Sequence, residues 1–213
     1  MLPLVLAAPQ NAVAPVVVAT GADISPVDVS APPAVHRKGI AVGLSLGAGI
    51  GGASGYPNNS EEIGDPTMFS SSGWLPGGGV GLFVMGALTD YLNFGFWFSE
   101  DTYRSASKHA TATGIGFRLE AFPLVYVYPR LEGLGFFAQF GIGVGKLVTP
   151  SRPDAEGTQS TIGTGVFYEW PLGHFLGGHL GLGPSLEYDA LWSLPLEEHG
   201  FLASGRVVFY GGP

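Results

Sequence analysis

Six charged residues fall on one face of four segments whose polarity alternates residue by residue, and they are the side chains best placed to do chemistry. In a narrow, poorly hydrated interior, opposed arginines and carboxylates pair or hold water, because an unpaired buried charge is costly. We predict a structural plug of salt bridges and hydrogen bonds, with a gated path for small cations as the alternative. The six residues are Arg118, Glu120, Glu169, Glu187, Asp189 and Arg206, and inward faces also carry the polar residues Gln139, His179 and Ser185.

Nucleophilic catalysis by serine requires a hydroxyl within hydrogen-bond reach of a histidine that a carboxylate orients. His179 and Ser185 share one face of a predicted strand, and Glu187 follows on the same face. Six residues of extended chain span about 20 Å, so the histidine and the serine do not meet. The sequence therefore predicts no catalytic residues and a protein that is not an enzyme.

Metal and cofactor sites are not predicted either. The chain has no cysteine, which excludes thiolate ligands and disulfides. No two histidines show ligand spacing, and the acidic stretch around Glu61 and Asp65 does not match a twelve-residue calcium loop. Nine basic residues against a net charge of -8 argue against a nucleic-acid partner, because phosphate binding needs clustered Lys and Arg.

The composition indicates an unusually apolar protein that does not rely on a membrane-spanning helix. Hydrophobic residues make up 46% of the 213 residues and charged residues only 12%, about half the usual share. No run of about 18 apolar residues occurs, so a spanning helix is not expected. With 35 glycines and 12% aromatics, the chain favours strands packed around a crowded interior.

A period-two pattern begins at Gly39 and defines the first predicted strand. Ile40, Val42, Leu44 and Leu46 alternate with small residues, so one face is aliphatic and the other is glycine and serine. The exposed face of a soluble strand normally carries longer polar residues. Small residues facing inward are what a narrow barrel with a filled interior requires.

The same alternation recurs in seven further segments, at 79–88, 94–99, 114–121, 136–145, 162–170, 179–189 and 201–209. The sequence therefore predicts an all-β fold, an eight-stranded antiparallel up-and-down transmembrane β-barrel over 38–213. The connections support it, because polar links alternate with links that are mostly short turns. We expect the polar links at 53–73, 101–108, 149–158 and 191–200, and the others at 89–91, 122–133 and 171–174.

Aromatic residues near the predicted strand ends fit interfacial girdles, where amphipathic rings meet the membrane surface. The alternative is that aromatics favour strands of any kind. The residues assigned to the girdles are Trp74, Tyr91, Tyr103, Tyr126, Tyr128, Trp170, Tyr188, Trp192 and Tyr210.

From Gly39 onward the chain resembles the small eight-stranded outer-membrane barrels, the group that includes the OmpA transmembrane domain, OmpX and the opacity-type adhesins. The resemblance rests on strand number, loop asymmetry and the final strand FLASGRVVFY, with Val207 and Phe209 on the lipid face. It implies a bacterial outer-membrane location and membrane lipid as a partner; the sequence leaves the oligomeric state open, with a monomer favoured. On this reading, residues 1–37 comprise a residual signal-like segment, MLPLVLAA, and a Pro/Ala-rich periplasmic linker.

The functional hypothesis is a structural or surface-interaction role, with an extracellular partner contacted through the first polar link. Loops on rigid barrels commonly carry recognition. The residues expected to make that contact are Tyr56, Glu61, Glu62, Asp65, Phe69 and Trp74. Passage or binding of small ions or molecules in the lumen is the alternative. A lipid-modifying enzyme and a lipocalin-like soluble binder, with its apolar face turned inward, are weaker alternatives.

Overall fold

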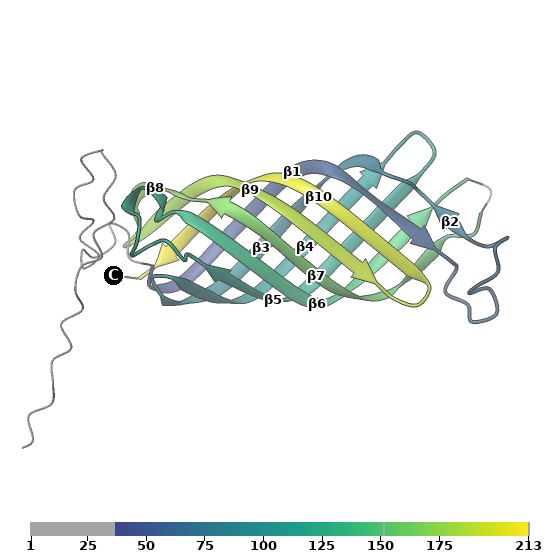
Figure 1. Ribbon diagram of the computed structural model, residues 1–213, viewed down its shortest axis with the longest axis horizontal. Helices are drawn as coiled ribbons and strands as arrows, with labels where there is room; N and C mark the ends of the chain where they lie inside the picture. Colours follow the sequence, from purple (N-terminus) through teal and green to yellow (C-terminus); the bar gives the residue numbers. More distant parts are fainter. Residues whose placement is uncertain (1–36, 151, 213) are drawn as a thin grey trace, which may run out of the picture.

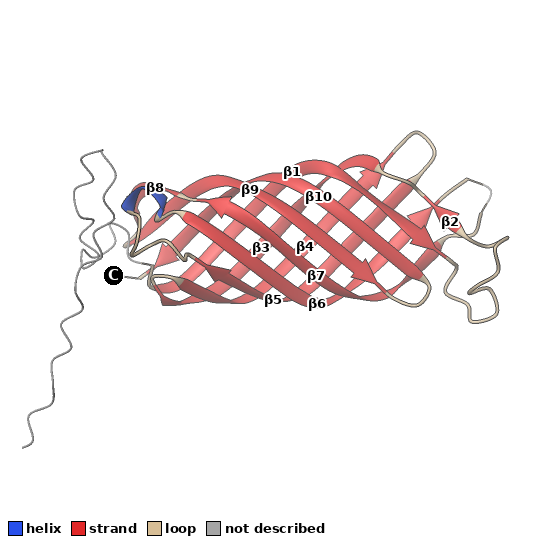
Figure 2. Ribbon diagram, viewed as in Figure 1, coloured by secondary structure: helices blue, strands red, loops and turns tan. Residues whose placement is uncertain are grey.

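The computed structural model describes residues 37–150 and 152–212 as a closed antiparallel barrel, so the predicted signal-like segment and linker lie almost entirely outside the described residues (Figure 1 and Figure 2). The strands are β1 (Gly39–Gly55), β2 (Ser70–Ser71), β3 (Leu75–Thr89), β4 (Leu92–Arg104), β5 (His109–Ala121), β6 (Leu134–Val148), β7 (Ala155–Tyr168), β8 (Trp170–Phe175), β9 (Gly178–Trp192) and β10 (Leu196–Gly211), with one 3-10 turn, η1 (Pro129–Leu131).

Eight strands form the wall of the barrel, as predicted from the sequence. β7 and β8 both pair with β9, so they are two parts of one wall strand that is interrupted at Glu169. The two-residue β2 pairs only with the far end of β1. β10 pairs with β9 on one side and with β1 on the other, which closes the barrel and leaves no free edge along its wall.

Burial follows the period of two along the strands. In β10, Leu202, Ser204 and Arg206 are buried in the interior, whereas Phe201 and Val207 are exposed on the outside. The inner face of β10 also carries apolar residues that pack in interior clusters, among them Leu202 beside Tyr103 and Val208 beside Phe83. The inward and outward faces predicted for the eight segments are those of the structure.

The outside of the barrel is a continuous belt of aliphatic and aromatic side chains. Leu46 is 69% exposed and Ile142 is 62% exposed. Phe117 on β5 lies against Phe94 on β4 and Phe140 on β6, each with ring centroids 5.7 Å apart. An apolar surface of this extent is unfavourable in water and matches a hydrocarbon environment. Among the described residues, no helix is long and apolar enough to cross a membrane.

Several strands extend further than the sequence predicted. β4 ends at Arg104 and β5 begins at His109, so the loop between them is only 105–108. Likewise, only 193–195 connect β9 to β10. In these additional strand segments the outward-facing residues are polar, for example Glu100 and Thr102. These side chains are polar because they lie beyond the apolar belt, in water. The strands continue there because their backbone hydrogen bonds form in water as well as in lipid.

Two other expectations were wrong. The link predicted at 171–174 lies inside β8, and the hairpin turns at Leu176 and Gly177, whose φ angles of 49° and 79° suit a type I′ turn. Tyr103 and Tyr210, assigned to the girdles, are each 1% exposed in the interior. The alternation continues through both positions, so strand parity, and not closeness to a strand end, decides where their rings point.

A charge placed on the apolar belt should destabilise the barrel in proportion to its depth in the membrane. We expect Phe96→Arg to reduce the free energy of unfolding in lipid vesicles by about 2–4 kcal/mol and Thr102→Arg by about 0–1 kcal/mol. Both residues face outward on β4, and Thr102 lies toward the polar end. Urea titrations followed by tryptophan fluorescence measure the difference. Equal losses for the two variants would contradict a lipid-facing belt.

Candidate functional site: the barrel interior

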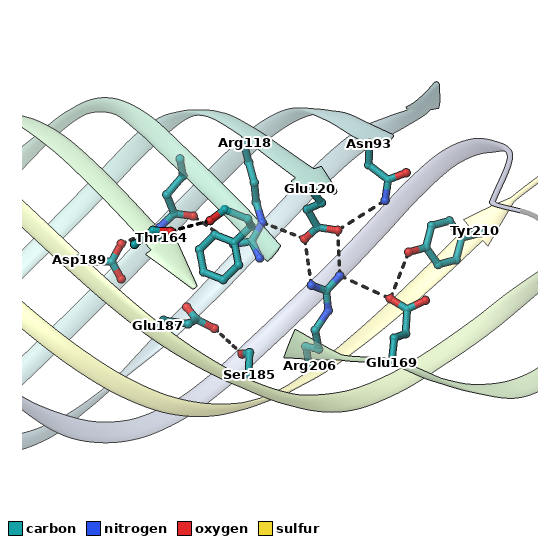
Figure 3. Close-up of polar contacts among 12 residues, drawn as sticks. Asn93, Arg118, Glu120, Thr164, Glu169, Ser185, Glu187, Asp189, Arg206 and Tyr210 are labelled. Atoms are coloured by element: carbon teal, nitrogen blue, oxygen red, sulfur yellow. Dashed lines mark hydrogen bonds and ion pairs between the residues drawn. The ribbon is translucent and has the colours of Figure 1, made fainter. Parts of the chain in front are cut away.

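Glu120 on β5 is the centre of the interior hydrogen-bond network (Figure 3). Arg206 on β10 donates to both carboxylate oxygens, from Nη1 at 2.9 Å and from Nη2 at 3.1 Å. Arg118 donates from Nε at 2.9 Å, and Asn93 Nδ2 lies 3.4 Å from Oε2. Glu120 is 0% exposed, and both arginines are also buried. One carboxylate is therefore shared by two guanidinium groups, the pairing that a buried charge requires.

Glu169 forms a second node nearer the chain termini. It occupies the break between β7 and β8, and its backbone N–H donates to the carbonyl oxygen of Gly133 at 2.9 Å. The Tyr210 hydroxyl donates to Oε2 at 3.1 Å, and Arg206 Nη2 lies 3.6 Å from the same oxygen. Arg37 Nε lies 3.7 Å from Oε1. The break in the strand thus positions a carboxylate between two arginines.

Each of the three interior arginines also lies over an aromatic ring. The guanidinium carbon is 3.7 Å from the ring centroid for Arg118 over Phe137, 3.7 Å for Arg206 over Phe167, and 3.6 Å for Arg37 over Phe122. These contacts cover the flat faces of the cations, while carboxylate and carbonyl oxygens accept from Nη atoms at the edges and from Nε of Arg118. The rings and ion pairs together fill the half of the barrel nearest the termini.

The middle of the interior is acidic. Gln139 accepts from Arg118 Nη1 at 3.0 Å and donates from Nε2 to Asp189 Oδ1 at 2.7 Å, so it links the ion pairs to the next layer. The Ser185 hydroxyl donates to Glu187 Oε1 at 2.6 Å. A cavity of about 10 Å³, room for one water molecule, is lined by Ser45, Gly79, Val80, Gly81, Ser99, Asp101, Glu187, Asp189, Leu202 and Ser204.

The interior nearest the loops is mostly apolar, although Gln159 and the carboxyl group of Glu198 are buried at the same level. Its apolar side chains pack as one buried cluster that crosses the barrel, with Lys and Arg absent from it. The members are Ala53, Leu75, Tyr103, Ala110, Leu147, Ala155, Leu196 and Leu202. Along its axis the barrel therefore changes from ion pairs over aromatic rings to carboxylates and hydroxyls, and then to an apolar layer.

The structure brings the predicted charged residues into one interior, in two groups. Arg118, Glu120, Arg206 and Glu169 form the ion-pair network, whereas Glu187 and Asp189 line the acidic middle. Of the predicted polar residues, Gln139 and Ser185 are in the interior. His179 is half-buried at the rim near the termini, where its ring centroid lies 4.9 Å from that of His174.

Sequence reasoning missed several buried polar residues. Asp101 and Glu198 fell within predicted loops, and Arg37 within the predicted linker, although all three are buried. Asn93 and Gln159 continue the inward parity of β4 and β7, so extending the alternation by a few residues would have found them. The missed residues lie at or beyond the predicted strand ends, where boundaries are least certain from sequence.

Catalytic or metal-binding geometry is not formed by the titratable residues that the structure describes. Ser185 donates to Glu187, and no hydrogen bond joins it to His179. Both ring nitrogens of His199 are engaged, Nδ1 with the Tyr188 hydroxyl at 2.9 Å and Nε2 with Glu197 Oε1 at 2.9 Å. Within 37–150 and 152–212, no group of three His, Cys, Asp or Glu residues is arranged to hold a metal ion.

The loop between β1 and β2 carries the residues predicted to make surface contacts. Tyr56 packs edge-on against Phe69 with ring centroids 5.3 Å apart, and its N–H donates to the carbonyl oxygen of Pro195 at 2.7 Å. Glu61 is exposed and Glu62 is half-exposed. Trp74, just before β3, is 57% exposed. The loop between β1 and β2 lies at the end of the barrel opposite the C-terminus (Figure 1).

Asp65 closes a local turn in the same loop. Its Oδ1 accepts from both the N–H and the hydroxyl of Thr67, each at 2.8 Å. These two hydrogen bonds, first the backbone and then the side-chain one, lower the pKa of the Asp65 carboxyl. The carboxylate therefore serves the loop's own conformation.

Known structures share this architecture. The crystal structure of Neisserial surface protein A matches with a TM-score of 0.52 and 12% identity over 81% of this chain and 97% of that one. The N-terminal barrel of OprF from Pseudomonas aeruginosa matches at 0.40 with 16% identity, over 81% of this chain and 98% of that one. The chain has the fold of the small eight-stranded outer-membrane barrels.

Ail from Yersinia pestis also matches the barrel, at 0.45 with 11% identity, over 80% of this chain and 99% of that one. No family model and no curated protein matches the sequence. The shared feature is thus the fold, and the role of this barrel has to be argued from its own residues.

Removing Glu120 should be much more damaging than neutralising Glu187. Glu120→Ala leaves two buried arginines without their shared carboxylate, so we expect a loss of about 3–5 kcal/mol in the free energy of unfolding. Glu187→Gln keeps an acceptor for Ser185 and removes a charge that no arginine pairs in the described interior, so we expect about 1 kcal/mol or less. Urea unfolding in detergent micelles measures both. Similar losses would mean that the ion pairs do not organise the interior.

Proposed function

We propose that the protein is a monomeric bacterial outer-membrane barrel with a structural and surface-interaction role, and that its interior is closed to ions. The apolar layer around Leu147 and Leu196 carries the proposal, because it crosses the interior at the loop end. An ion would have to shed its hydration to cross this layer, and the buried Glu198 carboxyl, opposite Ala53 in the register, would compensate a cation alone. Lipid is the partner of the outer belt, and no enzymatic activity is assigned.

The ion-pair network supports the same conclusion at the other end. Arg206 and Glu120 are joined by two hydrogen bonds, and aromatic rings cover the arginines. Opening a path there would break charge-assisted bonds and expose buried charges. Cation passage is the second candidate, because Glu187 and Asp189 beside the water-sized cavity would favour cations. That path would have to cross the apolar layer.

The surface role is supported by the way the first loop is held. Lys108, between β4 and β5, donates from Nζ to the carbonyl oxygens of Ser71 at 2.9 Å and Ser72 at 3.2 Å. The Thr149 hydroxyl donates to Ser70 Oγ at 3.2 Å. These contacts fix the returning part of the loop on the barrel and leave the polar tip exposed, which suits recognition on a rigid support.

The refolded protein should show no stepwise ion current in planar lipid bilayers bathed in concentrated KCl. The apolar layer and the ion pairs each block the axis, so we expect the single variants Glu187→Gln and Asp189→Asn to be silent as well. Refolding is checked by a gel-mobility shift between boiled and unboiled samples. A wild-type current that falls in these two variants would overturn the closed interior in favour of cation passage.

Cleavage on intact cells should identify the exposed end of the barrel. We expect endoproteinase Glu-C to cut at Glu61 or Glu62, and Glu61→Gln/Glu62→Gln to resist, because this loop faces away from the chain terminus. Glu132, in the link between β5 and β6 at the opposite end, is the internal control. Mass spectrometry of the fragments gives the site. Cleavage at Glu132 with an intact first loop would reverse the proposed orientation.

A further inference from the structure

An open groove lies on the outside of the loop end, where β1, β2 and β10 meet. Its volume is about 150 Å³, and it is lined by Gly52, Ala53, Ser54, Ser71, Gly73, Trp74, Glu197 and His199. The register places Ser54 opposite both Glu197 and Ser71, and Gly52 opposite His199. A tryptophan, two serines, a carboxylate and an imidazole therefore converge on one small space, here called the Trp74 groove.

Gly73 keeps the groove open beside the tryptophan. Its φ of +66° is a conformation that favours glycine, and a side chain there would project into open space. Trp74 follows directly, and its ring lies 5.8 Å from that of Phe201 while 57% of the residue stays exposed. The indole is thus supported by the barrel wall and accessible from the groove.

The charges around the groove select against ionic ligands. Glu197 pairs with His199 Nε2 at 2.9 Å, so an anion would meet a carboxylate. Lys108 Nζ donates to the carbonyl oxygen of Ser71, which lines the groove, at 2.9 Å, so an ammonium group next to the groove disfavours a cation. Serine hydroxyls and the second Glu197 oxygen supply both donors and acceptors. This mixture suits a neutral molecule with several hydroxyl groups.

We propose that the Trp74 groove binds the ring of a neutral sugar. The C–H face of a pyranose packs on the exposed indole, while its hydroxyls bond Ser54, Ser71 and Glu197, the arrangement of an apolar surface with a few placed polar groups. This inference rests on the proposed surface-interaction role and names the ligand class for that surface. Because Glu197 and His199 lie just beyond outward-facing Phe201, the sugar comes either from a glycolipid headgroup or from a free saccharide.

The test uses protein refolded in an amine-oxide detergent, which has no sugar headgroup. Methyl β-glucoside, methyl β-galactoside and methyl N-acetyl-β-glucosaminide are the free probes, and dodecyl maltoside is the lipid-linked probe. Saturation-transfer NMR reports binding, with affinities of about millimolar expected for ligands this small. Binding of the free glycosides indicates a free saccharide. The alkyl chain of the maltoside also enters the detergent around the apolar belt, so a glycolipid headgroup is indicated only by transfer to the maltose protons that is lost in Trp74→Ala; either result supports the proposal.

Variants locate the site. Trp74→Ala should weaken binding about tenfold or more, since ring stacking contributes on that order, and Glu197→Gln should weaken it less. Trp170→Ala is the matched control, an exposed tryptophan on β8 at the opposite end. The boiled-versus-unboiled gel shift checks folding. No transfer to any probe, or equal binding by Trp74→Ala, would overturn the sugar site, whereas failure of the surface role would appear separately as an uncut first loop on intact cells.

Discussion

The narrowness of an eight-stranded barrel constrains everything else in this protein. Every second residue of each wall strand projects into a space that side chains fill, so a large inward residue requires a small one beside it. A Cβ at Gly43 on β1, for example, would collide with the ring of Phe83 on β3. The inward glycines provide the room for rings such as Phe83, Trp97 and Phe167. The same narrowness leaves space for little water, so charges in the interior depend on one another.

That dependence explains how charge is arranged along the axis. Three arginines gather toward the termini, where Glu120 accepts hydrogen bonds from two of them, Glu169 forms longer ion pairs, and aromatic rings cover the guanidinium groups. Beyond Gln139 the ion pairs end, Asp189 accepts from an amide and Glu187 accepts from a hydroxyl. Further toward the loops, this acidic region is followed by the apolar layer. An ion moving along the axis would have to displace these buried groups, which is why we favour recognition at the loop end over transport through the axis.

The outer surface changes character at about the same level along the barrel axis as the interior does. Around the apolar belt, outward residues are aliphatic and aromatic, and hydrocarbon is their solvent. Toward the loops the outward positions become Glu100, Thr102, Glu197 and His199 while the ladder continues. The wall therefore extends beyond the membrane and supports polar side chains on rigid strands. The Trp74 groove lies at this boundary, where an aromatic platform and hydrogen-bonding groups are adjacent.

The sequence by itself determined the strands of the wall and which residues face inward, because the two-residue period is a local property of extended chain. It therefore placed Arg118, Glu120 and Arg206 on inner faces. Which of them meet was decided only by the tertiary structure, since Glu120 and Arg206 lie 86 residues apart. Their axial levels depend on the stagger with which the barrel closes. The same holds for the break at Glu169 and for the groove that Trp74 and Glu197 line together. Both depend on the register between distant strands, which no local sequence pattern encodes.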